Sequence, residues 1–253
     1  MPVSTLKLSK LAPAPGYKRV ADLIETEILN GTLSAGDLLP TEGELAEQLG
    51  VHRSTVREGI RSLENAGLVR RGSGKRLEVC VPSEQDIARS TTRALGLNRF
   101  SFIDLWEVQM NFEPFSAGLA AERVPDEVLS KLERNLQRTK KHLKDDAAII
   151  DADIEFHQLI AAATGNKALI LAVKPIGMLL FSATRELYRL SPNARTRLLQ
   201  AHERIFDALL KHDATEARAW MTRHILDFRR GYEVANLDVN APIDFDASAL
   251  ARQ

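Results

Sequence analysis

Hydrophobic side chains recur with a helical period in three short segments within residues 17–66, and each segment ends in a turn-forming residue. Thr41 and Glu44 have the spacing of a capping box, so the second helix is predicted to begin beside them. The third segment covers residues 53–66, and two short β-type runs follow around a glycine-containing turn at residues 72–75. The pattern therefore predicts three helices and a small hairpin.

From residue 87 to residue 235 the hydrophobic period is helical throughout, and no run is typical of a strand. The period is interrupted at six places rich in glycine, proline, asparagine or aspartate: residues 96–98, 124–126, 144–146, 165–166, 191–192 and 212–213. This spacing predicts six or seven helices packed as a bundle.

The chain is thus predicted to be mainly α, with a winged helix-turn-helix at residues 17–81 and an all-helical bundle at residues 91–235. Residues 1–16 are rich in serine, lysine, proline and alanine, so we expect them to be flexible. Residues 82–90 are expected to form a linker. Residues 236–253 form a C-terminal tail that the pattern does not place.

Composition favours a soluble cytoplasmic protein. Among 253 residues, 34 basic side chains balance 34 acidic ones, and Cys80 is the single cysteine, which fits a reducing compartment. The N-terminal segment lacks the apolar core of a signal peptide. The longest apolar run covers residues 169–181. Lys174, Pro175 and Gly177 interrupt it, so no segment is expected to provide the roughly 20 apolar residues of a membrane helix.

Basic charge is concentrated around the third predicted helix. Arg53, Arg57 and Arg61 follow one another at intervals of four residues and therefore share one helical face. Residues 51–76 hold seven basic side chains against two acidic ones, whereas residues 20–50 hold seven acidic side chains and no basic one. A chain of zero net charge can therefore present a positive face to phosphate.

This helix has the side chains that a DNA-recognition helix uses. An arginine near its beginning can form two hydrogen bonds to guanine, which gives about 1–3 kcal/mol of discrimination. Ser54 and Thr55 are placed for phosphate or base contacts, and Lys75 is placed at the tip of the predicted wing. An arginine stripe alone is most often a solvated face. The capped helix, turn, arginine-rich helix and wing, in that order, favour DNA binding.

The stretch LPTEGELAEQLGVHRSTVREGIRSLENAGLV at residues 39–69 resembles the DNA-binding domain of the GntR family. The resemblance implies that Arg53 and Arg57 contact bases or phosphates. It also implies that Ser73 and Gly74, at the tip of the wing, enter the minor groove.

Three positions depart from the family pattern. Gly43 stands where family members often have arginine, which removes one expected operator contact. His52 and Gly59 stand where serine and alanine are usual. A glycine in the middle of a helix costs roughly 1 kcal/mol relative to alanine, and the sequence does not show what Gly59 provides in return.

In the second domain, one aspartate and three histidines have a spacing typical of a metal site. Asp153 and His157 lie four residues apart and so share a helical face. His202 and His224 lie eleven residues before and after Asp213, so an antiparallel helix pair would bring them to the same height. Imidazole and carboxylate together suit zinc, nickel, iron or manganese. Spacing alone also allows these four side chains to have no ligand role. That is what we expect of the remaining histidines, His52, His142 and His212.

Residues 87–235 resemble the FCD domain, the helical effector domain of the FadR subgroup of the GntR family. The segments that carry this resemblance are residues 107–113, 117–121, 153–157 and 164–166, with His202 and His224. The resemblance implies that Asp153 and the three histidines bind a divalent metal, zinc foremost, and that an effector carboxylate completes its coordination.

Two further residues are expected at the effector. Gln109 stands where many such domains have arginine, so it can form hydrogen bonds but adds no charge. Arg185 is a second candidate pocket residue, although an arginine on a helix is usually solvated.

Together these features predict a ligand-responsive repressor that binds a palindromic DNA operator as a homodimer and senses a small organic acid at a metal-containing pocket. One alternative keeps DNA binding but replaces the metal with an apolar pocket for an acyl or similar ligand. A metallohydrolase is the least favoured alternative. Glu155, the nearest candidate base, lies two residues from both Asp153 and His157 and so points elsewhere, and no nucleophile motif is present.

Overall fold

The computed structural model of the protein describes residues 14–72, 76–191 and 193–244. The chain folds into two compact units, Met1–Asp86 and Ile87–Gln253.

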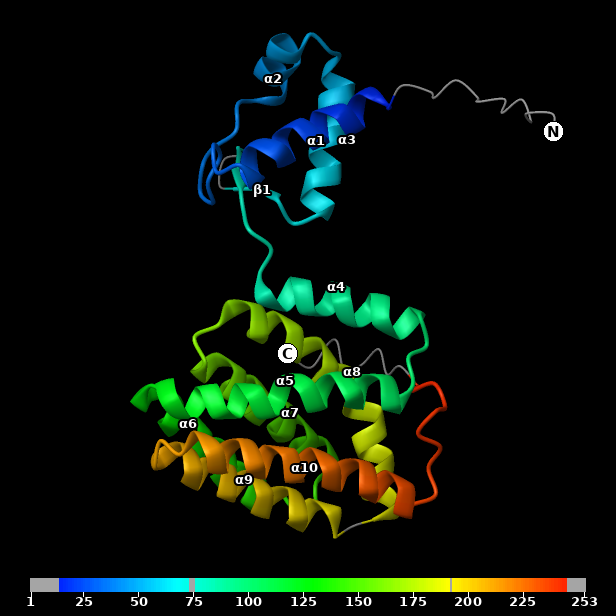
Figure 1. The fold of residues 1–253 in the computed structure, drawn as a ribbon. Helices are drawn as coiled ribbons and strands as arrows, with labels where there is room; N and C mark the ends of the chain where they lie inside the picture. Colours follow the sequence, from blue (N-terminus) through cyan, green and yellow to red (C-terminus); the bar gives the residue numbers. More distant parts are fainter. Residues whose placement is uncertain (1–13, 73–75, 192, 245–253) are drawn as a thin grey trace, which may run out of the picture. The chain divides into compact units, whose positions relative to one another are not determined.

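The described residues of the first unit form three helices and a two-stranded sheet in the predicted order (Figure 1). Their bounds are α1 Gly16–Leu29, α2 Glu42–Leu49, α3 Arg53–Asn65, β1 Val69–Arg71 and β2 Leu77–Val79. The strands are antiparallel, with Val69 opposite Val79. The Thr41 hydroxyl accepts a hydrogen bond from the Glu44 N–H, and the Glu44 carboxylate accepts one from the Thr41 N–H. The winged helix-turn-helix and its capping box are confirmed.

The apolar faces of the three helices form the core of this unit, in which Val56, Ile60 and Leu63 of α3 are almost completely buried. Arg53 and Arg57 lie on the opposite, exposed side of α3, as the helical period predicts. The tip of the wing, with Ser73, Gly74 and Lys75, lies outside the described residues.

Gly59 allows α1 and α3 to approach closely. A Cβ atom at this position would lie 2.9 Å from the Tyr17 carbonyl oxygen and 3.0 Å from Val20 Cγ1. Alanine would therefore collide with the α1 backbone or push the two helices apart. This packing accounts for a glycine in the middle of a helix, which the sequence left unexplained.

The second unit is all-helical, and its seven described helices confirm the predicted bundle. Their bounds are α4 Glu84–Leu97, α5 Phe102–Arg123, α6 Asp126–Lys141, α7 Asp146–Ala163, α8 Lys167–Leu190, α9 Ala194–Leu210 and α10 Ala214–Val234. Each predicted interruption of the hydrophobic period falls at a helix boundary.

Helix α4 begins at Glu84, inside the expected linker and three residues before the helical period predicted from residue 87. Ser83 is the reason: its hydroxyl accepts a hydrogen bond from the Asp86 N–H, while the Asp86 carboxylate accepts one from the Ser83 N–H. This reciprocal pair caps the beginning of a helix.

Helix α8 also corrects an expectation, because its 24 residues continue through Lys174, Pro175 and Gly177 without a break. By length and composition alone it could cross a membrane, with a mean hydropathy of 1.5 over an 18-residue window. Of this window, 56% is buried inside the protein, as in the core helix of a soluble domain. Pro175 is itself buried within the helix.

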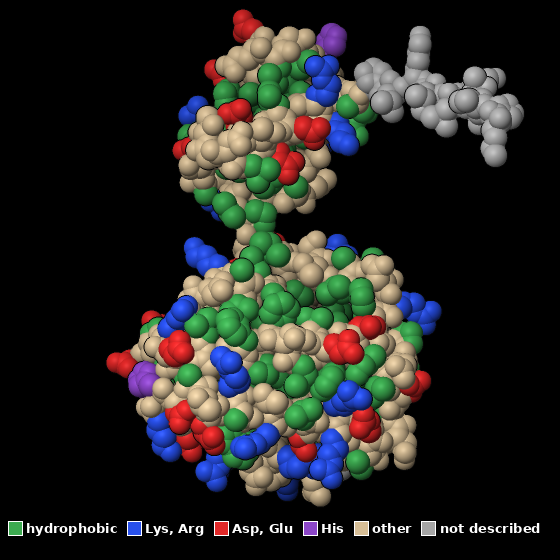
Figure 2. All heavy atoms as spheres, in the orientation of Figure 1, with side chains coloured by type: hydrophobic (Ala, Val, Ile, Leu, Met, Phe, Trp, Pro, Cys, Tyr) green, Lys and Arg blue, Asp and Glu red, His purple; other side chains and the backbone are tan. Residues whose placement is uncertain are grey.

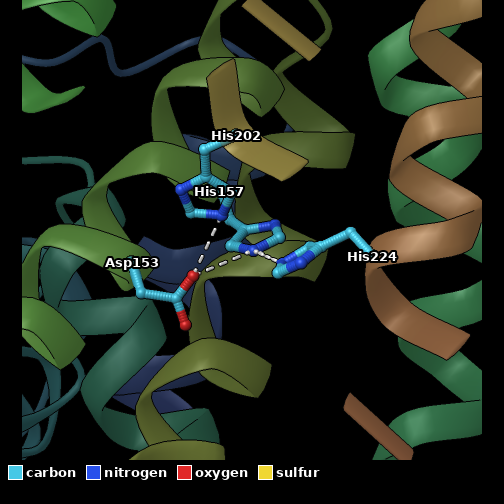
Figure 3. Close-up of side chains that lie close together, drawn as sticks. All are labelled: Asp153, His157, His202 and His224. Carbon is cyan, nitrogen blue, oxygen red and sulfur yellow. Dashed lines mark hydrogen bonds and ion pairs between the residues drawn. The ribbon is translucent and has the colours of Figure 1, made fainter. Parts of the chain in front are cut away.

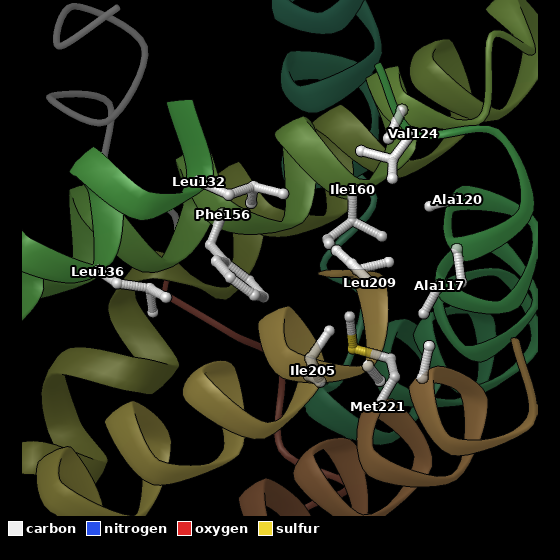
Figure 4. Packing of buried hydrophobic residues seen from close by; sticks show 14 of the residues in the cluster. Ala117, Ala120, Val124, Leu132, Leu136, Phe156, Ile160, Ile205, Leu209 and Met221 are labelled. Carbon is white, nitrogen blue, oxygen red and sulfur yellow. The ribbon is translucent and has the colours of Figure 1, made fainter. Parts of the chain in front are cut away.

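Five helices of this unit share one apolar core (Figure 4). Leu132 of α6 and Phe156 and Ile160 of α7 meet Ile205 of α9 and Met221 of α10, with small alanines of α5 alongside. This packing holds α7, α9 and α10 together, and these are the helices that carry the four candidate metal ligands.

The part of the C-terminal tail that is described lies against this unit. The Val239 carbonyl accepts a hydrogen bond from the Ile103 N–H, and the Ile243 N–H donates one to the Phe100 carbonyl. Leu237 packs with Val239 and Ile243 against a second apolar cluster built largely from α7, α8 and α9.

Candidate metal centre and DNA-binding face

The four candidate ligands converge inside the second unit (Figure 3). Asp153 and His157 are one turn apart on α7, His202 lies on α9, and His224 lies on α10. One ligand atom from each of these residues lies within 4.8 Å of the others. The structure therefore brings together all four residues that the sequence selected, which spacing along the chain alone did not require.

The distances between these atoms fit coordination of one ion. Asp153 Oδ1 lies 3.4 Å from His157 Nε2 and 3.3 Å from His202 Nε2, and the Nε2 atoms of His157 and His224 are 3.2 Å apart. Zinc–nitrogen bonds of about 2.0–2.1 Å in a tetrahedron place neighbouring ligand atoms about 3.3–3.4 Å apart. The residues present therefore fit a transition-metal ion.

Packing fixes the orientation of His202. Its ring is completely buried and stacks on the Phe156 ring at 3.8 Å between centroids, with an angle of 8° between the planes. Its Nδ1 atom has no hydrogen-bond partner among the described residues. A metal at Nε2 would compensate a buried polar ring whose polar atoms are otherwise poorly satisfied.

Glu113 of α5 belongs to this site, although no role was predicted for it from the sequence. Its buried carboxylate contacts Nδ1 of His157, whose Nε2 faces the other ligands. A carboxylate that accepts a hydrogen bond from a metal-binding histidine fixes the ring and its tautomer. The available signal was a glutamate four residues after Gln109, on the same face of a largely apolar helix.

Without an ion, burial and charge set the protonation of the four residues. Burial raises the pKa of Asp153, but hydrogen bonds with His157 and His202 outweigh it and hold that pKa well below its usual range. Burial lowers the pKa of His157, yet the Glu113 and Asp153 carboxylates raise it to about 10. Burial lowers the pKa values of His202 and His224. The ion-free site therefore holds one imidazolium, at His157, and two neutral imidazoles.

A cavity of about 50 Å³ adjoins the ligands, which is more than the space that one water molecule needs. Gln109, Gln158 and Tyr188 line it, and Gln109 Oε1, Gln158 Nε2 and the Tyr188 hydroxyl have no hydrogen-bond partner among the described residues. The rest of the lining is largely apolar, and Lys174 and Asp227 supply charges of opposite sign. Such a cavity suits a small ligand with both polar and apolar atoms.

Gln109 lies at this cavity, as expected, but Arg185 does not. Thr184 and Tyr188 line the cavity, whereas Arg185 is exposed and its guanidinium lies 5.8 Å from the centre of the Phe181 ring. Arg185 lies about 100° around α8 from Thr184, which turns its side chain towards solvent rather than towards the cavity.

In the first unit, α2, α3 and the wing surround a groove lined by arginines. The arginines that line it are Arg53, Arg57, Arg61, Arg71 and Arg76. Glu42 at the beginning of α2 forms ion pairs of 3.0 Å with Arg57 and with Arg71. Ser54 is exposed and Thr55 is half-buried at the start of α3. The ion pairs of Glu42 bring charges from three elements together and were not predicted.

A winged helix-turn-helix with an arginine-lined groove, followed by a helical unit with a cavity beside four potential metal ligands, defines a DNA-binding transcriptional regulator with an effector domain. Residues 16–79 match the family described as bacterial regulatory proteins, gntR family, and residues 104–227 match the FCD domain. The chain belongs to the GntR family of bacterial regulators and carries an FCD domain.

Known relatives agree with this assignment. The Uxu operon regulator of Haemophilus influenzae is 30% identical over 215 residues, covering 83% of this chain and 79% of that protein. The HTH-type transcriptional repressor NanR of Enterobacter sp. is 29% identical over 229 residues, covering 82% and 83%. The solved structure of Streptococcus agalactiae GntR covers 85% of this chain and 99% of its own, with a TM-score of 0.61 and 29% identity. These families and relatives are regulators, so the hydrolase alternative has no support.

Proposed function

We propose that this regulator is a repressor that binds a palindromic operator as a homodimer and responds to a small organic acid bound beside a metal ion. The observation that carries the proposal is the convergence of Asp153, His157, His202 and His224 next to a cavity with unpaired polar groups. A bound ion would supply a positive charge to which a carboxylate oxygen of the effector binds. Zinc suits these ligands best, and nickel, manganese and iron are the alternatives.

The DNA contacts of this proposal come from the start of α3 and from the wing. Arg53, Ser54, Thr55 and Arg57 contact bases and phosphates. Ser73, Gly74 and Lys75 contact the minor groove or the backbone from the tip of the wing, which lies outside the described residues. Because Arg57 is paired with Glu42, DNA binding exchanges this ion pair for an ion pair with phosphate or for hydrogen bonds with a base.

An apolar surface on the second unit supports the homodimer. Val108, Phe112 and Phe115 of α5 are each more than a third exposed, and Figure 2 shows hydrophobic side chains gathered on this face. Large exposed apolar patches mark interaction sites. A second copy that covers this face would give the two-fold symmetry that a palindromic operator requires.

In this proposal the protein acts in the cytoplasm, where binding of the effector changes its affinity for the operator. The effector changes operator affinity only as far as it binds the DNA-bound and DNA-free states differently. The names of two relatives, the Uxu operon regulator and the transcriptional repressor NanR, support repression of an operon as the function. The cavity limits the effector to a small molecule.

Elemental analysis of the purified chain, with thermal-shift measurements, tests the metal and the effector together. We expect one zinc ion per chain, its loss in His202→Ala, and its retention in His142→Ala, which lies outside the cluster. Organic acids that bind the native state should raise the melting temperature of the metal-loaded chain only. A chain that binds no metal yet is stabilised by acyl compounds would establish the apolar-pocket alternative instead.

Binding to the DNA upstream of the gene that encodes this protein tests the proposed operator recognition. We expect a preference over random DNA, with an affinity that falls as salt rises because phosphate contacts release counterions. Equal affinity for the two DNAs would contradict operator recognition.

A further inference from the structure

The Arg53 guanidinium lies directly against the backbone of Gly43. A Cβ atom built on Gly43 would lie 2.4 Å from Arg53 Nη2, 3.0 Å from Cζ and 3.2 Å from Nε. Real Cβ atoms do not approach other atoms to less than 3.0 Å, so no residue but glycine allows this position of the guanidinium. Gly43 is in the first turn of α2 and its φ is not in the left-handed region, so the backbone itself does not require glycine.

We propose that Gly43 positions Arg53 for reading the operator and is therefore a specificity-determining residue of this regulator. The inference rests on the proposed contact of Arg53 with DNA. Glycine is among the least favourable residues inside a helix, so its presence in α2 calls for a compensating role. The space it leaves for the Arg53 guanidinium supplies that role.

Two other arginines of the same groove, Arg57 and Arg71, are held by carboxylates. Glu42 binds both Arg57 and Arg71, and Arg71 also forms an ion pair of 3.0 Å with Glu64. No carboxylate forms an ion pair with Arg53 in the part of the chain that the structure describes. The surface of Gly43 therefore limits where the Arg53 guanidinium can lie, whereas ion pairs limit Arg57 and Arg71.

A side chain at position 43 would change the position of the Arg53 guanidinium without damaging the fold. The atoms that a new Cβ would meet belong to the far end of a flexible side chain, so they can move aside. Arg53 would then leave its present position between α2 and α3, and a two-hydrogen-bond contact with guanine depends on the angle and height of the guanidinium. Contacts with phosphates tolerate such a change better, since they depend mainly on charge.

The test compares full-length Gly43→Ala, Arg53→Ala and the double variant with the wild type. Gln48→Ala is the matched control, because Gln48 is exposed on the same helix. Preferred sequences are selected from a random DNA library, and affinities are measured for the selected operator, for its single-base variants and for random DNA. Melting temperatures show whether each variant is folded.

We expect Arg53→Ala to lose discrimination at one position of each half-site by roughly 5- to 150-fold, the range that one arginine–guanine contact provides. Gly43→Ala should change the preference at the same position, with a melting temperature no lower than that of the wild type, because alanine favours the helix, and with unchanged affinity for random DNA. In the Arg53→Ala background, Gly43→Ala should have no further effect, because coupled residues are not additive. Gln48→Ala should behave as the wild type.

Two results would overturn the inference in distinguishable ways. If Arg53→Ala leaves the base preference unchanged, the proposed DNA contact of Arg53 fails and the role of Gly43 fails with it. If Arg53→Ala changes the preference but Gly43→Ala does not, or if the two effects add, only the positioning role of Gly43 is refuted.

Discussion

Replacing Glu113 by glutamine tests how the metal centre is organised. The change keeps the size of the side chain but removes the carboxylate that contacts His157 Nδ1. Losing such a partner of a metal-binding histidine typically costs about 10–100-fold in metal affinity. Glu107→Gln removes a carboxylate from the exposed side of the same helix and serves as the control.

The raised pKa of His157 determines how metal affinity changes with pH. Glu113 and Asp153 raise the pKa of His157 to about 10, so an ion must displace one proton from this ring throughout the neutral range. His202 and His224 have lowered pKa values and stay neutral. Metal affinity of the wild type should therefore rise about tenfold per pH unit between roughly pH 7 and pH 9.

Glu113→Gln lowers the pKa of His157, because the negative charge that favours the imidazolium is gone. Its metal affinity should then rise less steeply with pH than that of the wild type. The advantage of the wild type over Glu113→Gln should be largest at pH 9, where proton competition in the wild type is weakest, and should shrink or reverse towards pH 6. Titration with zinc buffered by a competing chelator at several pH values measures both the affinity and the slope.

The reasoning would be refuted if Glu113→Gln bound zinc as tightly as the wild type at pH 9. Equal pH slopes in the two proteins would refute the assignment of the displaced proton to His157. A loss of affinity in Glu107→Gln of the same size would show an effect of overall charge rather than of the contact with His157.

Two further predictions concern the stability of the DNA-binding unit, followed by calorimetry of the full chain. Thr41→Ala removes the side-chain acceptor for the Glu44 N–H and should destabilise the unit by about 1 kcal/mol, so an unchanged unfolding transition would contradict the role of the cap. Gly59→Ala gains helix propensity but places a Cβ 2.9 Å from the Tyr17 carbonyl oxygen; we expect a net loss of roughly 1–3 kcal/mol from overpacking, and a rise in melting temperature would show that α1 moves aside without cost.

The local pattern of hydrophobic and capping residues predicted most of the secondary structure. The capping box at Thr41 and the helical period of Val56, Ile60 and Leu63 predicted α2 and α3 closely, because these signals act within one or two turns. The start of α4 at Glu84 was predicted three residues too late. Ser83 and Asp86 have the spacing of a capping pair, but Pro82 and Ser83 were interpreted as a linker; the hydrogen bonds between Ser83 and Asp86 show the cap.

Some residues of the candidate metal centre were predicted from the sequence, and others were visible only in the structure. Asp153 and His157 are related by helical periodicity, and His202 and His224 by symmetry about a turn, so the sequence itself selected all four. Glu113 could not be selected in this way, because it reaches His157 from another helix, across 44 positions of the chain. Arg185 was misplaced because its direction depends on the rotation of α8 about its axis, which the packing of the bundle sets.

Residue chemistry and spacing thus determined the two-domain organisation, the arginine-rich helix and the four candidate ligands. Contacts between elements decided the rest. Gly59 is explained by the α1 backbone, and Gly43 by the side chain of Arg53. A glycine leaves no side chain from which a neighbour can be inferred, so its purpose is visible only when the folded chain shows what occupies the space beside it.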